Sequence, residues 1–244
     1  PIRGSKPLKN LKKMNKIEEI VKSSAARHEN SRKEYRVFGT NIFIKDELPE
    51  NIDFKKVIRQ IEFLIPSTLF VGLDVIYIGH FKEFEERDIN AFYSDGAIYI
   101  TNEQTDHNDI IDDLVHELSH AIEETNWEII YIDKSLEDEF LSKRATLKRI
   151  LKSQDYNLSG LDLSDPSYSR EFDEFLYKEL GYEKLTTFVQ GLFPSAYSVT
   201  SLKEYWATGF EEYYLGDRRY LAHTSPRIYN KIKTLEEKGE HPDG

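Results

Sequence analysis

The sequence predicts an α+β fold in which a small mixed sheet precedes a mainly helical C-terminal half. Short β-type segments are confined to the first hundred residues, and helical periodicity follows from about residue 106. A content of 39% hydrophobic and 13% aromatic residues is enough to form a core. Because no composition shift divides the remainder, we expect one folded domain at 37–244 and a separate N-terminal arm at 1–36.

The sheet is predicted from three segments in the first half. The segment EYRVFGTNIFIK, residues 34–45, carries β-type residues on both sides of a glycine, and LDVIYIG (73–79) and GAIYIT (96–101) read as short apolar strands. Between them, NIDFKKVIRQIEFL (51–64) has its apolar residues on one helical face and is stopped by Pro66.

The second half is predicted to be helical. The expected helices are at about 106–125, 136–153, 169–180, 182–192, 201–215 and 225–237. The stretch 153–169 is rich in Ser, Asp, Gly and Pro, so we expect a long surface loop there. An aromatic set on the fifth helix is expected to pack in the interior: Tyr205, Trp206, Phe210, Tyr213 and Tyr214.

The net charge of −11 is unevenly distributed. Residues 1–36 carry 11 Lys and Arg against 4 Glu, whereas the rest carries 22 basic against 40 acidic residues. Apolar residues at helical spacing within 8–26 predict a basic helical arm. Such an arm can dock on an acidic partner, on nucleic acid or on the protein's own body, and the acidic body argues against a general nucleic-acid binder.

The absence of cysteine excludes disulfides, thiolate ligands and cysteine nucleophiles, so any zinc must be held by His, Asp or Glu. The longest apolar run, residues 63–79, is interrupted by Pro66 and Asp74, and we therefore expect a soluble protein without a membrane span. No apolar signal segment is visible. Secreted, cytoplasmic and virion-associated locations all stay open.

The motif HELSH, at 116–120, is the main chemical signal of the sequence. Four residues make a little over one helical turn, so His116 and His120 face the same side, and Glu117 lies about 100° away. This is the H-E-x-x-H pattern, with two zinc ligands and a glutamate that takes a proton from a water polarised by the zinc. The alternative is an ordinary helix that carries two partly exposed histidines.

A third ligand must come from elsewhere, since the chain continues SHAIEETNWEI and lacks the glycine and third histidine of a metzincin. The segment 195–217 offers a tyrosine followed by a helix whose first turns carry Glu204, with Glu211 on the same face two turns later. Glu211 and His223 remain alternative ligands at this point.

The pair HELSHAIEE and AYSVTSLKEYWATGFEEYY resembles the catalytic domain of the anthrax lethal factor type, a branch that also includes small clostridial Pro-Pro endopeptidases. Members carry a tyrosine seven residues ahead of a glutamate ligand on a later helix, and Tyr197 and Glu204 stand seven apart. The resemblance covers roughly residues 70–235.

This resemblance implies a zincin-like metallopeptidase fold of the gluzincin type and a zinc endopeptidase activity on protein or peptide substrates. It implies His116, His120 and Glu204 as ligands of Zn²⁺, Glu117 as general base, and Tyr197 as the hydroxyl that stabilises the oxyanion. The alternative from another class is a structural or partner-binding protein, such as a virion or toxin-complex component, that keeps the fold with little or no turnover.

Two positions depart from the family pattern. Ser119 replaces the usual glycine before the second histidine, and Thr208 stands where the family has a second acidic residue four positions after the glutamate ligand. The candidates to orient the imidazoles instead are Asp113, Glu123 and Glu124, and the alternative for at least two of them is a charged, solvated helix face.

The family also implies an edge strand above the cleft that pairs with an extended substrate. The segment 96–101 comes directly before the HELSH helix, so we expect it to be this edge strand. For Ile98 and Tyr99, ordinary alternating strand positions are an equally good interpretation.

Overall fold

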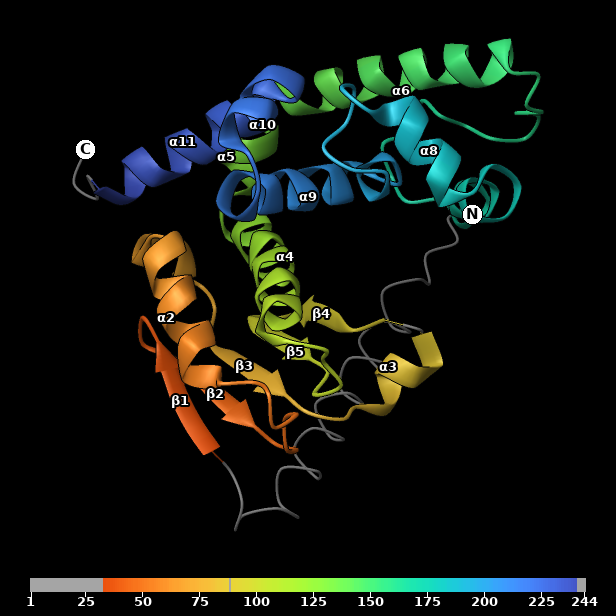
Figure 1. Ribbon diagram of the computed structural model, residues 1–244. Helices are drawn as coiled ribbons and strands as arrows, with labels where there is room; N and C mark the ends of the chain where they lie inside the picture. Colours follow the sequence, from red (N-terminus) through yellow and green to blue (C-terminus); the bar gives the residue numbers. More distant parts are fainter. Residues whose placement is uncertain (1–32, 88, 241–244) are drawn as a thin grey trace, which may run out of the picture.

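The computed structural model describes residues 33–87 and 89–240. In this part of the chain a small mixed sheet is followed by a helical half, which confirms the α+β organisation (Figure 1). The predicted helix at 8–26 and most of the basic arm lie outside the described residues. The last four residues of the predicted arm, 33–36, belong to the first strand.

The sheet has five strands in the order β1-β2-β3-β5-β4. Their bounds are Lys33–Val37 (β1), Thr40–Ile44 (β2), Val75–Ile78 (β3), Ala91–Ser94 (β4) and Ala97–Ile100 (β5). The three central strands are parallel, and an antiparallel hairpin lies at each end. Both hairpins turn through two residues of positive φ, as tight hairpin turns require: Phe38 with Gly39, and Asp95 with Gly96.

The expectation that segment 96–101 is the edge strand is wrong. β5 lies between β3 and β4, and all four of its residues are buried, including Ile98 and Tyr99. The turn at Asp95 and Gly96 folds the chain back, so the preceding residues AFYS pair with the outer side of β5. Among the described strands, β4 is therefore the end of the sheet on this side, and all its residues are partly exposed.

One face of the sheet packs against helices α2 (Phe54–Leu64) and α4 (His107–Thr125) (Figure 1). Aligned isoleucines of the three parallel strands form this face: Ile42, Ile44, Ile76, Ile78, Ile98 and Ile100. The opposite face carries a smaller cluster that includes Phe81 and Phe84, at the start of α3 (Lys82–Arg87). The alternation of residues along each strand thus provides both faces.

The helical half contains every helix that periodicity predicts. The bounds are α5 Trp127–Tyr131, α6 Ser135–Ser153, α7 Arg170–Glu174, π-helical η2 Phe175–Leu180, α8 Tyr182–Val189, α9 Leu202–Leu215, α10 Arg218–Thr224 and α11 Pro226–Glu240, with 3₁₀ turns η1 Ser67–Phe70 and η3 Tyr197–Val199. Helices α3, α5 and α10 were not predicted, because elements of five to seven residues are too short to show periodicity. The predicted loop at 153–169 joins α6 to α7.

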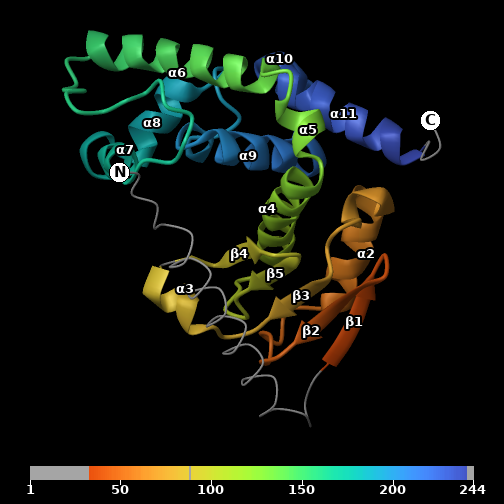
Figure 2. The same ribbon diagram turned by 180° about the vertical axis from the view of Figure 1, so that it is seen from behind.

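Helix α4 connects the two halves, since it rises from the sheet and crosses α9 (Figures 1 and 2). The aromatic residues predicted to pack from α9 are all buried: Tyr205, Trp206, Phe210, Tyr213 and Tyr214. Within the two described ranges, no helix combines the length and the apolar character that crossing a bilayer requires.

A buried lysine ties the 190–196 loop and the end of α10 to α6. The Lys143 ammonium donates hydrogen bonds to the carbonyl oxygens of Leu192 and Thr224. Burial lowers the pKa of Lys143 from 10.5 to about 8, although the charge of Glu139 opposes this effect. The lysine therefore loses its proton in the folded state at a lower pH than in the unfolded state.

This pKa difference predicts how stability varies with pH. Between pH 8 and 10 the unfolded chain holds a proton on Lys143 that the folded protein has released, so the free energy of unfolding should rise with pH, by at most about 1.4 kcal/mol per pH unit. Urea denaturation of wild type and Lys143→Met between pH 7.5 and 9.5 measures it. The variant should lack this rise, whereas Lys152→Met, at an exposed lysine of the same helix, should keep it. If the unfolding free energies of wild type and Lys143→Met rose equally with pH, Lys143 would not be the group responsible.

Candidate functional site

Helix α4 places the two histidines of HELSH on one side. Its first turn is closed by a capping box, in which the Asp106 side chain accepts from the backbone of Asn108 and Asp109 and the Asp109 carboxylate accepts from the backbone of Asp106. The rings of His116 and His120 lie with their centroids 5.1 Å apart. One helical turn therefore brings two imidazoles to the same place.

Helix α9 brings Glu204 to these histidines. Its N-cap, Ser201, accepts a hydrogen bond from the backbone N–H of Glu204 at 3.1 Å, so Glu204 lies in the first turn. The indole N–H of Trp206 donates to the carbonyl oxygen of Ser119 at 3.0 Å, which fixes α9 against α4. As a result, Glu204 Oε2 lies 3.2 Å from His116 Nε2.

The three residues could hold a metal ion. Within the described ranges, one donor atom from each of His116, His120 and Glu204 lies within 4.8 Å of the other two. Glu204 Oε2 is buried and has no hydrogen-bond partner among the described residues, although it is close to His116. An unsatisfied buried carboxylate oxygen is unfavourable, and a cation would relieve it. Two imidazole nitrogens and one carboxylate oxygen are a donor set that zinc uses in sites with an open position.

The electrostatics around His116 also favour a cation. Burial alone would lower the pKa of His116, but its contacts with Glu204 and Glu211 outweigh this effect and raise the pKa to about 11. Burial alone would raise the pKa of Glu204, but His116 and then the charge of His120 hold it below its ordinary value. Positive charge is thus strongly stabilised between the histidines and Glu204.

Each histidine meets a carboxylate at Nδ1, which for His116 is a second carboxylate besides Glu204. His116 Nδ1 donates to Glu211 Oε1 at 2.5 Å, and His120 Nδ1 donates to Glu123 Oε2 at 3.2 Å. Such carboxylates fix the tautomer and the ring orientation of metal-binding histidines. Glu123 is itself held by the hydroxyl of Tyr131, which donates to Oε1 at 3.0 Å.

These contacts show where most of the other candidate ligands and orienting carboxylates lie. Glu211, an alternative ligand from sequence, lies against the outer nitrogen of His116, and its place two turns after Glu204 was the signal that led to it. Glu124 accepts from the hydroxyl of Tyr93 instead of contacting a histidine. Asp113 accepts from the side chain of Gln104. His223 lies exposed on α10, outside the group of donors.

The two departures from the family pattern are accommodated in different ways. Ser119 is fully buried, and its hydroxyl donates to the carbonyl oxygen of His116 at 2.6 Å, so the small side chain is satisfied within its own helix. Thr208 donates to the carbonyl oxygen of Glu204 at 2.7 Å. The acidic residue that contacts His116 lies three positions further on, at Glu211.

Glu117 has the environment of a proton acceptor. Its side chain is buried, and burial raises its pKa above the ordinary value, although the charges of His120 and His116 oppose this effect. The backbone amide of Tyr93, on β4, also stabilises its ionised form. A carboxylate with a raised pKa is a more effective base near neutral pH. Glu117 is also adjacent to β4.

Tyr197 lies close to His116. Its ring centroid is 6.3 Å from that of His116, and it belongs to η3, directly before the N-cap of α9. Burial, followed by the charge of Glu204, raises the pKa of Tyr197, so its hydroxyl keeps its proton and can donate a hydrogen bond.

A buried arginine holds the segment that carries Tyr197. Arg144 of α6 is 1% exposed, and its guanidinium donates to the carbonyl oxygens of Val199, Thr200 and Asp165. These bonds link η3, the start of α9 and the 153–169 loop to one rigid helix. Arg144 could not be found from the sequence, because an arginine that binds main-chain carbonyl oxygens produces no recognisable sequence motif.

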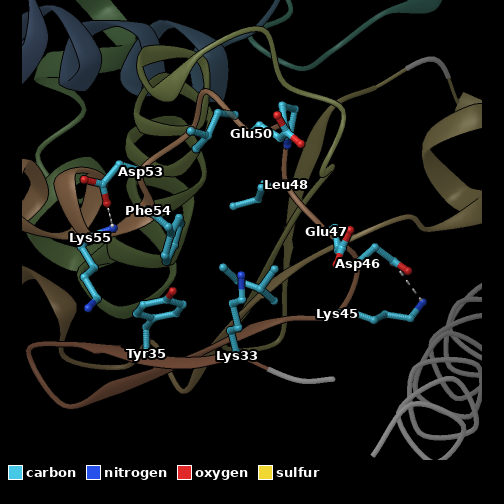
Figure 3. A pocket seen from close by; sticks show the side chains of 13 residues that line it. Lys33, Tyr35, Lys45, Asp46, Glu47, Leu48, Glu50, Asp53, Phe54 and Lys55 are labelled. Atoms are coloured by element: carbon cyan, nitrogen blue, oxygen red, sulfur yellow. Dashed lines mark hydrogen bonds and ion pairs between the residues drawn. The ribbon is translucent and has the colours of Figure 1, made fainter. Parts of the chain in front are cut away.

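A separate hollow lies at the β1 side of the sheet and has a volume of about 560 Å³. It is lined by β1, the segment 44–53 and the start of α2, and the rings of Tyr35 and Phe54 meet edge to face on one side (Figure 3). Three lysines and four carboxylates belong to its lining, and none of the five candidate site residues lines it. The grouped histidines and carboxylates are therefore not in this hollow.

No protein-family model matches this chain, and neither a curated protein nor a solved structure does.

The contact between His116 and Glu211 predicts a change in metal affinity. Glu211→Gln keeps the shape of the side chain but removes the negative charge beside Nδ1, so zinc affinity should fall by roughly 10- to 100-fold. Competition with a chromophoric chelator measures the affinity. Glu212→Gln is a matched control on the same helix, and it should leave zinc affinity unchanged. Equal affinities for Glu211→Gln and wild type would remove Glu211 from the site.

Proposed function

We propose that this protein is a zinc-dependent endopeptidase of the gluzincin type, similar to the lethal factor family. The observation that carries the proposal is the convergence of His116, His120 and Glu204, with donor atoms within 4.8 Å of one another, beside Glu117 and Tyr197. The resemblance in motif spacing supports the same roles for these five residues. An arrangement that only bound a partner would require neither a buried base nor a protonated phenol beside the histidines.

In this proposal the residues divide the work of peptide hydrolysis. When bound, zinc polarises the attacking water and the substrate carbonyl. Glu117 accepts a proton from the water and delivers it to the leaving amine. The Tyr197 hydroxyl donates to the carbonyl oxygen as negative charge develops there. Glu211 and Glu123 hold His116 and His120 in their orientations.

We propose that the substrate pairs with β4, and not with the segment 96–101. In the antiparallel pairing of β4 with β5, Asn90 accepts a hydrogen bond from the backbone N–H of Thr101, so the alternating pattern directs the peptide groups of Ala91 and Tyr93 away from β5. The Tyr93 N–H already meets Glu117, which leaves the N–H and carbonyl of Ala91 and the carbonyl of Tyr93 for pairing. An extended peptide can add there as a further strand. The Tyr93 backbone lies beside Glu117, which supports this placement.

Two measurements on the full chain test the function. Metal analysis should find about one zinc per chain. The protein should also cleave a randomised decapeptide library, a chelator should stop this cleavage, and added zinc should restore it. Zinc without any cleavage would favour the alternative, a binding protein that keeps the fold. A chain that takes up no zinc would contradict the site itself.

Glu117→Gln should bind zinc as the wild type does and lose nearly all hydrolysis. The reason is that Glu117 acts on the water and not on the ion, and a general base contributes roughly 10² to 10⁴ in rate. Zinc content and kcat/KM on a library-derived peptide measure the two effects. The control is Glu103→Gln, an exposed carboxylate ahead of α4, which should keep full activity. Hydrolysis by Glu117→Gln at the wild-type rate would exclude Glu117 as the base.

Tyr197→Phe should also keep its zinc, but its kcat should fall by roughly 10² to 10³, the usual effect of losing one oxyanion donor. KM should change little, because the hydroxyl acts mainly in the transition state. Tyr177→Phe, an exposed tyrosine on η2, is the matched control and should be unchanged. A loss confined to KM would assign Tyr197 to substrate binding instead.

A further inference from the structure

A cavity of about 420 Å³ adjoins the candidate site. One side is formed by α5 and the start of α6, and the other by residues 166–168 and the start of α9. Its lining is mainly apolar and includes Trp127, Tyr131, Ile132, Tyr168 and Leu202. Its volume lies in the range of ligand sites, roughly 300 to 1,000 Å³.

Three of these side chains are unusually exposed for their size. Trp127 is 56% exposed, Ile132 66% and Tyr168 56%, and they come from different parts of the sequence. Scattered exposed apolar residues are ordinary, but three that line one cavity form a continuous apolar surface. Covering this surface would remove apolar area from water, which favours binding of an apolar group.

Two residues connect the cavity to the histidines and Glu204. Glu123 lines the cavity, and its Oε2 accepts a hydrogen bond from His120 Nδ1. Lys203, also in the lining, directly precedes Glu204 and lies 3.8 Å from Glu123. The end of the cavity nearest the site is therefore charged, while most of the exposed lining is apolar, and a peptide segment offers this same combination of groups.

The spacing along α4 indicates how far the cavity lies from the reacting bond. From Glu117 to Glu123 the helix advances six residues, or about 9 Å at ~1.5 Å per residue. An extended peptide covers ~3.3 Å per residue, so about three residues span this distance. The bond between the Tyr93 hydroxyl and Glu124 holds β4 near the same end of α4, so a peptide that pairs with β4 is close to the cavity.

The walls of the cavity are fixed before any ligand binds. The backbone N–H of Leu202 donates to the carbonyl oxygen of Pro166 at 2.8 Å, which joins the 166–168 segment to α9. Arg144 holds the neighbouring carbonyl of Asp165. The Tyr131 hydroxyl donates to Glu123 on the opposite wall. A preformed site binds without the entropic cost of ordering its own loops.

We infer that this cavity is a specificity subsite that takes a large apolar side chain, aromatic or branched aliphatic, of the peptide substrate, about three residues from the cleaved bond. The inference rests on the proposed peptidase function. It adds a substrate class: peptides with a bulky apolar residue at that distance from the bond.

Trp127 itself provides a readout that does not depend on hydrolysis. The chain has two tryptophans, and the other, Trp206, is fully buried, so acrylamide quenching of fluorescence reports mainly on Trp127. The protein is full-length, zinc-loaded Glu117→Gln, and the probes are capped, tryptophan-free decapeptide libraries with Phe, Leu, Ala or Asp fixed at one position. Phe and Leu libraries should protect Trp127 from quenching, and Ala and Asp libraries should not.

Cleavage by the wild type provides the second readout. Replacing Phe by Ala about three residues from the cut bond should lower kcat/KM by roughly 10-fold or more, the usual range for loss of a large apolar contact. In Ile132→Ser, the ratio of kcat/KM for the Phe peptide to kcat/KM for the Ala peptide should be only about 2-fold or 3-fold. The protection of Trp127 from quenching should also be weaker. Phe63→Ser removes an apolar side chain that is 88% exposed on α2, outside the cavity, and should change neither measurement.

The outcomes separate this inference from the proposed function. Cleavage without protection of Trp127 by apolar libraries, or an apolar preference that Ile132→Ser leaves intact, overturns the subsite and leaves the peptidase. Protection of Trp127 by Phe and Leu libraries with no cleavage by the wild type supports apolar peptide binding in the cavity and overturns the peptidase.

Discussion

The crossing of α9 over α4 is the contact on which the candidate site depends. The histidines lie on α4 and Glu204 lies on α9, so no local interaction can set the distance between them. That distance is set by Trp206, whose indole donates to the carbonyl oxygen of Ser119, the residue directly before His120. Both Trp206 and Ser119 are fully buried. A larger side chain at position 119 would separate the helices, and this gives a physical reason for a small residue there.

Helix α9 is in turn held at its start and at its middle. At its start, Arg144 binds the carbonyl oxygens of Val199 and Thr200, which places η3 and Tyr197. Further along, a Cβ on Gly209 would lie 2.5 Å from the Ile228 side chain, so the glycine allows α11 to pack closely on α9. The sheet takes no part in these contacts. Its role in the site is to support α4 and to place β4 beside Glu117.

The sequence was sufficient for the parts of the structure that depend on local periodicity. Helices α4, α6, α9 and α11 follow from apolar spacing, and the shared direction of His116 and His120 follows from the helical pitch. The position of β4 could not be predicted, because AFYS is short and its place is decided by the hairpin turn. The role of Glu211 was also out of reach. Its helix face was clear, but only the packed helices show which nitrogen of His116 it meets.

The two histidines differ in how they are held, and the difference has a thermodynamic consequence. His120 takes its carboxylate from Glu123 on the same helix, so its orientation can form as soon as α4 does. His116 takes its carboxylates from Glu204 and Glu211, which reach it only when α9 is packed against α4. A cation held by His116, His120 and Glu204 would bind the packed arrangement and not the separated helices, so its binding free energy would add to that of the crossing. The packing of α9 against α4 and the affinity for such a cation would then be two measures of one equilibrium.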